Sequence, residues 1–261
     1  MIRRPAVAGL FYPDDAGRLA GTVARALDVP VPDGEPPPKA VIVPHAGYVY
    51  SGPTAGVGYA RVRALRGVVE RVVLLGPAHH VFVDGIAVSS ADAFLTPLGA
   101  IVVDDTLRRR VLGHPAVCLD DRAHVAEHSL EVQLPFLQET LGTFTLLPLA
   151  VGDSGPDDVA AVLDLVWVGR ETLVVVSSDL SHYRAYEPAR VQDERTAAAI
   201  VRGDVTAIGD DDACGARPIR GLLVAARARR LAIRLLDLRS SGDTAGDRDR
   251  VVGYGAFALS D

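Results

Sequence analysis

The chain alternates between short apolar runs and longer stretches in which apolar residues recur every three or four positions. Uninterrupted runs of Val, Ile and Leu are typical of strands that are covered on both faces. The predicted strands are 40–43, 71–76, 85–90, 144–152, 172–178, 231–238 and 251–259. The helical periodicity between them predicts helices at 54–65, 105–113, 129–141, 156–167, 187–203 and 218–230.

This alternation predicts an α/β fold, in which a central mixed, largely parallel β-sheet is flanked by helices. The Pro-rich connector 29–40 lies too near the amino terminus to separate two domains, and no internal repeat is present. The polar segment 240–250 is expected to be a loop between the last two strands. We therefore predict that residues 1–261 form a single domain with a substantial core.

Polar side chains capable of chemistry follow three of the predicted strands. His45 follows the first strand, His79 and His80 follow the second, and Asp179 and His182 follow the strand 172–178. Each histidine alone could be a loop residue that bonds to the backbone. Because ligands of open α/β sheets bind beyond the carboxyl ends of the strands, the grouping favours one shared site.

The residue types at these positions suit a transition metal. Neutral imidazoles with a thiolate or a carboxylate bind zinc, iron or copper, and two histidines with one carboxylate suit non-haem Fe(II). Asp179 could be that carboxylate, or it could orient His182. Cys214 precedes a predicted helix whose dipole is expected to stabilise its thiolate, which makes it an alternative ligand. Its other interpretation is a small helix-capping residue next to Gly215.

A second motif competes with the shared site. The stretch "HVAEH", residues 124–128, matches the H-x-x-E-H pattern of zinc proteases, provided that 122–138 form one continuous helix. Glu127 and His128 could also reach the shared site without that chemistry. The chain contains no P-loop, no complete dinucleotide fingerprint and no G-x-S-x-G nucleophile elbow.

Composition narrows the classes of partner. The net charge is −6, with 33 acidic and 27 basic residues, which argues against a nucleic-acid partner. No apolar run approaches the ~20 residues of a membrane helix, so we expect a cytoplasmic protein without membrane contact. Two cysteines do not form a disulfide framework in a chain of this length. Cys118 lies in an apolar, strand-like stretch and is expected to be an inert buried thiol.

Six sequence blocks resemble those of a known family. "AGLFYP", "PHAGYVYSG", "LGPAHH", "EHSLEVQLPFL", "SSDLSHY" and "CGARPI" occur in this order between residue 8 and about residue 219. Together they resemble the Memo-like protein family, whose bacterial and archaeal members are also called AmmeMemoRadiSam system protein B. The blocks cover nearly the whole chain.

The resemblance implies a fold similar to that of the class III extradiol dioxygenases. It also implies metal ligation by His45, His79 and Cys214, with Asp179 and His182 completing the pocket and His80 in a supporting position. The related dioxygenases have a carboxylate where this family has the cysteine. A thiolate would alter the potential of an iron ion and favour softer metals such as copper, which puts ring cleavage in doubt.

Two classes of function follow from these patterns. The first is a mononuclear metal-dependent oxidoreductase acting on a small aromatic or phenolic substrate, or in redox metal handling. Its metal would be Fe(II), with copper or zinc as alternatives, while His182 serves as acid and base and Asp179 orients it. The second is a non-enzymatic module that binds a metal, a peptide or a partner protein. A zinc hydrolase is a weaker third alternative.

Overall fold

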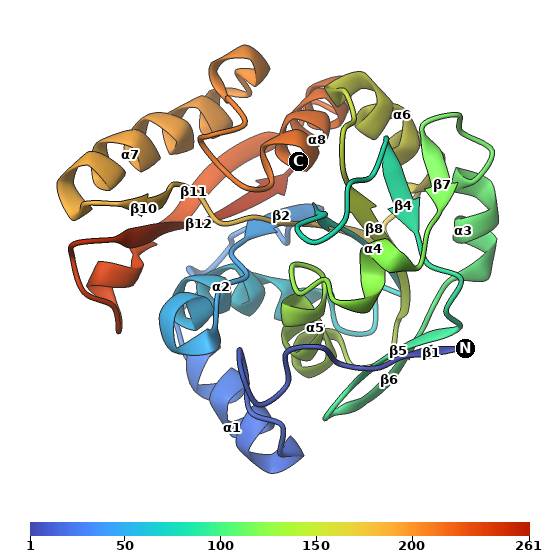
Figure 1. Ribbon diagram of the computed structural model, residues 1–261, viewed down its shortest axis with the longest axis horizontal. Coiled ribbons are helices and arrows are strands. Elements are labelled where there is room, and N and C mark those ends of the chain that lie inside the picture. The colour runs from blue at the N-terminus through green and yellow to red at the C-terminus, as the bar shows by residue number, and fades with distance from the viewer.

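A nine-stranded mixed sheet forms the centre of the molecule (Figure 1). The computed structural model describes all 261 residues. Four parallel strands occupy the middle of the sheet in the spatial order β2 (Ala40–Val43), β9 (Thr172–Ser177), β3 (Arg71–Pro77) and β8 (Thr145–Val151). Their side chains are buried on both faces, as the uninterrupted apolar runs predict.

Shorter and antiparallel strands extend this sheet on both sides. Next to β8 lie β4 (Ile86–Val88), which is antiparallel to it, and β7 (Val117–Leu119). Next to β2 lies β12 (Val251–Ser260), which also pairs with β11 (Ala232–Ser240) and β10 (His182–Arg184). A separate small sheet contains β1 (Ile2–Arg3), β5 (Ala93–Thr96) and β6 (Gly99–Val102).

Helices cover both faces of the central sheet, and alternate residues of each strand point to opposite layers. Ile42 packs in the layer of α3 (Asp105–Val111), α6 (Pro156–Val166), α7 (Tyr186–Arg202) and α8 (Ala216–Ala228). Val41 and Val43 pack in the layer of α1 (Ala16–Ala26), α2 (Tyr48–Val62) and α5 (Leu134–Leu141). The short helix α4 (Arg122–Val125) and four 3₁₀ turns complete the chain.

The predicted α/β architecture is confirmed, with one mixed and largely parallel sheet between helical layers. The seven predicted strands form within a few residues of their expected bounds. The short strands β1, β5, β6, β7 and β10 were not predicted. Runs of two to four residues carry too little periodicity to be recognised.

Two helices begin at residues other than those predicted. The helix expected at 54–65 already begins at Tyr48, whose backbone N–H donates to the Phe11 carbonyl at 2.7 Å, and it contains Pro53. The proline and the glycines around it made this first turn resemble a loop. The helix expected at 129–141 begins at Leu134, after a 3₁₀ turn at 131–133.

The prediction that Cys118 is a buried thiol is wrong. This side chain is exposed, because β7 is the last strand of the sheet and its residue 118 points away from the core. The apolar sequence around it did not reveal an edge position.

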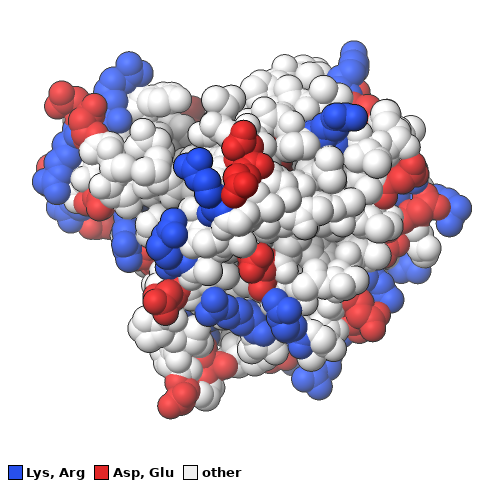
Figure 2. Space-filling model, turned by 90° about the horizontal axis from the view of Figure 1, so that it is seen from below, with Lys and Arg blue, Asp and Glu red and all other residues white.

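The molecular surface has mixed charge. On the face in Figure 2, arginine and lysine side chains are intermingled with aspartates and glutamates rather than separated into regions. Among the helices, none combines the length and the apolar character that crossing a lipid bilayer requires.

Candidate metal centre

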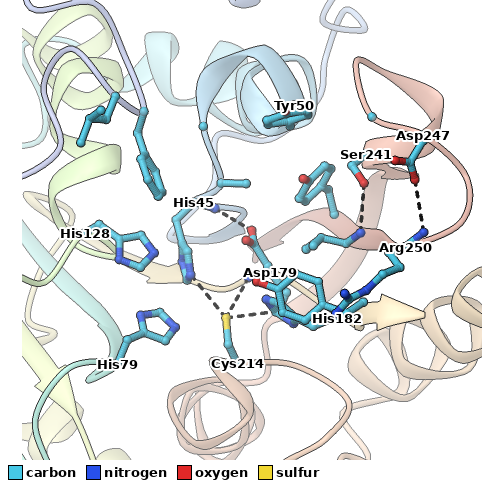
Figure 3. A pocket seen from close by; sticks show the side chains of 18 residues that line it. His45, Tyr50, His79, His128, Asp179, His182, Cys214, Ser241, Asp247 and Arg250 are labelled. Carbon is cyan, nitrogen blue, oxygen red and sulfur yellow. Dashed lines mark hydrogen bonds between the residues drawn. The ribbon is translucent and has the colours of Figure 1, made fainter. Parts of the chain in front are cut away.

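The carboxyl ends of three neighbouring parallel strands meet at one edge of the sheet. His45 follows β2, His79 follows β3, and Asp179 follows β9, which lies between them. These residues line one cavity of about 720 Å³, together with His182 and Cys214 (Figure 3). The structure thus brings together the predicted site residues except His80, which does not line the cavity.

Three histidines form the metal-binding geometry of this cavity. The candidate ligand atoms of His45, His79 and His128 all lie within 4.8 Å of one another. The rings of His79 and His128 stack with their centroids 4.8 Å apart, and the His45 ring lies edge-on to both. His45 is buried, His128 is half-buried and His79 is exposed, so the cluster closes on the protein side and opens toward the cavity.

Ser177 fixes the tautomer of His45. The Ser177 hydroxyl donates its only proton to the Ser129 carbonyl at 2.6 Å and accepts from the Gln133 amide at 2.8 Å. It can therefore only accept from His45 Nδ1, which lies 2.8 Å away. The proton of the imidazole is held at Nδ1, and the lone pair of Nε2 faces the cavity.

Glu127 performs the same task for His79. Its Oε1 accepts from His79 Nδ1 at 2.9 Å, and its Oε2 accepts from the His79 backbone N–H at 2.6 Å. Burial disfavours the carboxylate, but the bonds from His79 and from the Ser129 backbone outweigh it and hold the pKa of Glu127 well below its usual range. In a neutral His79 this bond places the ring proton at Nδ1 and leaves Nε2 as the donor to a metal, as in the carboxylate–histidine pairs of metal proteins.

His128 completes the cluster from the segment between α4 and the 3₁₀ turn at 131–133. Phe11 packs against its ring at 4.9 Å between centroids. Burial lowers the pKa of His128 to about 4, despite the nearby Glu127 charge, which raises it. The imidazole is therefore neutral at pH 7, as metal ligation requires. No strand ends at His128, so the search for polar residues after predicted strands did not find it. Its place in "HVAEH" nevertheless left it as a candidate.

The zinc-protease interpretation of "HVAEH" is wrong. The helix α4 ends at Val125, so the required continuous helix is absent. His124 is buried with its Nε2 3.1 Å from the Ala87 carbonyl, beside Phe94, and it does not line the cavity. The two histidines of the motif therefore lie in different places, His124 in the protein interior and His128 at the cavity.

Cys214 lies beside His45 but outside the mutually close group of histidines. Its Sγ is 3.3 Å from His45 Nε2 and accepts from the Asp179 backbone N–H at 3.3 Å (Figure 3). The expected thiolate stabilisation by the helix dipole is overridden, because burial and the Asp179 charge raise the pKa of the thiol well above its usual range. Ligation of a metal by Cys214 stays a prediction.

Asp179 and His182 both line the cavity, but no hydrogen bond joins them, so the predicted orientation of His182 by Asp179 stays a prediction. Asp179 Oδ1 accepts from the His45 backbone N–H at 2.8 Å, so the carboxylate braces the strand exit that carries His45. Burial raises the pKa of Asp179 to about 7. His182 lies in β10, and burial lowers its pKa. Whether Asp179 or His182 acts in catalysis stays a prediction.

Other cavity residues came from segments without a recognisable signal. The loop after β11 contributes Ser241, Asp247 and Arg250, although its sequence indicated only a polar connector. His80, expected in a supporting position, is exposed, with its ring 5.8 Å from that of His128.

Comparison with known proteins identifies relatives over the whole chain. The family model described as "Memo-like protein" matches residues 3–258. A "MEMO1 family protein" of Aquifex aeolicus is 39% identical over 267 residues, which cover 97% of each chain. A "MEMO1 family protein" of Metallosphaera sedula is 34% identical and matches over the full length of both chains.

The fold is also found among solved structures. The crystal structure of an uncharacterised protein from Escherichia coli K12 superposes with a TM-score of 0.51, over 82% of this chain and 98% of that chain. The sequence identity is 15%, so this similarity supports the α/β architecture alone.

Proposed function

The chain belongs to the Memo-like protein family, and on that premise we propose that it is a mononuclear metal-dependent oxidoreductase for a small aromatic or phenolic substrate. The observation that carries this proposal is the histidine cluster at the open cavity. Two of its three imidazoles are held by hydrogen bonds in the tautomer that presents Nε2.

The donor set fits a catalytic transition metal. Imidazole nitrogens bind iron, copper and zinc, and a site with three protein ligands and an open side is typical of catalysis rather than of structure. We propose Fe(II) as the metal, held by His45, His79 and His128. Cys214, whose sulfur lies 3.3 Å from His45 Nε2, is proposed as a further or alternative ligand. Bound Fe(II) would supply electron transfer and polarise an oxygen substituent of the substrate.

The protein residues around the metal site would bind the substrate and move its proton. Tyr50 and Tyr254 provide aromatic walls of the cavity, beside the apolar Phe11. His182 is neutral because burial lowers its pKa, so it can accept a phenolic proton. Asp179 holds the backbone of His45 and thereby orients the ligand.

Oxygen uptake tests this activity. Protein reconstituted anaerobically with Fe(II) is mixed with oxygenated buffer and a panel of catechols, and oxygen consumption is measured. We expect uptake that depends on the catechol, and His182→Gln should lower kcat about 10²- to 10⁴-fold with unchanged iron content. The zinc-loaded protein is the control without redox chemistry. Iron-loaded protein that consumes no oxygen with any catechol contradicts the proposal.

A partner-binding module is the second candidate, and exposed apolar side chains at the cavity mouth favour it. Leu10 is 81% exposed and Tyr183 is 65% exposed, and both line the cavity. A peptide could cover them. A defined partner whose binding survives both His45→Ala and Cys214→Ser would support this function. A partner whose binding is lost together with the metal would instead tie partner binding to the metal site.

A further inference from the structure

One cationic side chain lines the cavity without an anionic partner. Arg250 comes from the loop between β11 and β12, and no carboxylate lies within 4 Å of its guanidinium, whereas Arg239 of β11 forms an ion pair with Asp237. In Figure 3 it lies on the side of the cavity opposite His79 and His128. Although Arg250 is exposed, an unpaired cation that lines a cavity favours the binding of an anionic group there.

Tyr183 holds the guanidinium in position. The Arg250 guanidinium carbon lies 5.1 Å from the centroid of the Tyr183 ring, a cation–π distance. Tyr183 has a φ of 57°, a left-handed conformation that is unfavourable for a bulky residue, and it lies at an irregularity in the pairing of β10 with β12. This left-handed conformation turns the Tyr183 side chain out of the direction it would have in a regular strand, and the ring lines the cavity.

The other charges of the cavity leave Arg250 free. Asp247 also lines the cavity, but its Oδ1 accepts from the backbone N–H groups of Asp249 and Arg250, at 3.0 and 3.3 Å. Asp179 is buried and faces the backbone of His45. The planar fork of a guanidinium stacked on a ring matches a carboxylate, which it can bind through two parallel hydrogen bonds.

We propose that Arg250 recognises a carboxylate of the substrate, so that the substrate is an aromatic acid with its phenolic end at the histidines. This inference rests on the proposed function for the phenolic end, and on Arg250 and Tyr183 for the acidic end. Arg250 would act in specificity and not in the chemical step.

Isothermal titration calorimetry tests recognition of the phenolic end and of the acidic end of the substrate separately. Zinc-loaded protein, which lacks redox turnover, is titrated with catechol and with 3,4-dihydroxybenzoate, and metal-free protein is titrated with benzoate. We expect the wild type to bind 3,4-dihydroxybenzoate roughly ten- to a hundredfold more tightly than catechol, the size of a charge-assisted pair. Arg250→Gln should remove this preference, and Arg250→Lys should retain part of it.

Arg248 provides the matched control. It is also exposed and stacks on a tyrosine, with its guanidinium carbon 4.3 Å from the Tyr186 ring centroid, but it does not line the cavity. Arg248→Gln should keep the full preference. Equal affinities for the two probes in the wild type, or a preference that persists in Arg250→Gln, overturn the proposal. Failure of zinc or catechol binding would instead count against the proposed function, while the benzoate titration would still report on Arg250.

Discussion

At the scale of single residues, the candidate metal centre depends on the groups behind its imidazoles. Ser177 holds a proton at Nδ1 of His45, and Glu127 holds one at Nδ1 of His79. Neither residue needs to touch a metal in order to determine which ring nitrogen is available. The negative charge of Glu127 also makes His79 a stronger electron donor to a metal.

Replacing Glu127 tests this dependence. Glu127→Gln keeps the side-chain shape but removes the negative charge that accepts from His79 Nδ1 and from the His79 backbone N–H. We expect metal affinity to fall about 10- to 100-fold in a competition titration with a chromophoric chelator, while the protein stays folded. Glu187→Gln, which replaces an exposed carboxylate on α7, should bind metal as the wild type does. Unchanged affinity in Glu127→Gln would show that the carboxylate does not support ligation.

His124 makes the stability of the fold depend on pH. Burial lowers its pKa to about 4 in the folded protein, against 6.5 for the unfolded chain. Between these values the unfolded state binds more protons, so the stabilising contribution is complete above pH 6.5 and is lost as the pH falls toward 4. Between pH 6.5 and 5 the loss is about 2 kcal/mol.

Urea unfolding at several pH values measures this contribution. The free energy of unfolding of the wild type should fall over that range by about 2 kcal/mol more than that of His124→Gln, since the other titrating groups are common to both proteins. Parallel pH profiles for the two proteins would show that His124 titrates normally.

At the scale of secondary-structure elements, parallel strands and close helix packing position the site. Adjacent parallel strands bring His45, Asp179 and His79 to one sheet edge. The helix α2 begins just beyond His45 and packs on α1 through Gly56, where an added Cβ would lie 2.0 Å from the Ala26 carbonyl oxygen. Gly56 thus allows a backbone contact that no other residue permits.

Two alanine substitutions in α2 distinguish this contact from helix propensity. Gly56→Ala forces α1 and α2 apart and should destabilise the protein by about 1–3 kcal/mol or more, as overpacking does. Gly52→Ala places its Cβ 3.5 Å from Tyr48, an ordinary contact, and should be neutral or stabilising by up to about 1 kcal/mol. Thermal unfolding compares the two, and equal shifts would contradict the packing argument.

The elements also explain which parts of the site were predictable. A buried run of Val and Ile marks a strand, and the residue after it lies at the sheet edge, so His45 and His79 could be placed from the sequence. His128 and Arg250 follow no strand, and their positions depend on how irregular segments fold back over the sheet. The beginning of α2 was missed for a related reason, because Gly and Pro signal a loop unless the neighbouring helix is known.

At the scale of the whole molecule, the amino-terminal segment connects the small sheet to the candidate metal centre. Arg3 in β1 is buried and pairs with Glu131, and it also donates to the carbonyls of His124 and Glu127. It therefore anchors the segment that carries both Glu127 and His128. Further along the same amino-terminal segment, Phe11 packs on the His128 ring.

Removing the Arg3 charge should affect stability and metal binding together. Arg3→Met leaves Glu131 buried without its partner, which costs about 3–5 kcal/mol. It also loosens the segment with His128, so metal affinity should fall as well. Arg4→Met changes the exposed neighbour and should alter neither quantity. Chemical denaturation measures the first effect and metal titration the second. A destabilised Arg3→Met variant with unchanged metal affinity would show that Arg3 does not support the metal site.

The central claim is that His45, His79 and His128 together hold one transition-metal ion. Its most direct test is the metal stoichiometry and affinity of protein purified without chelators or affinity-tag nickel. The wild type should bind about one equivalent per chain, with His128→Ala losing tight binding and His80→Ala, which changes the adjacent exposed histidine, retaining it. Wild-type affinity in His128→Ala, together with loss of binding in Cys214→Ser, would contradict the claim and assign the third position to the cysteine.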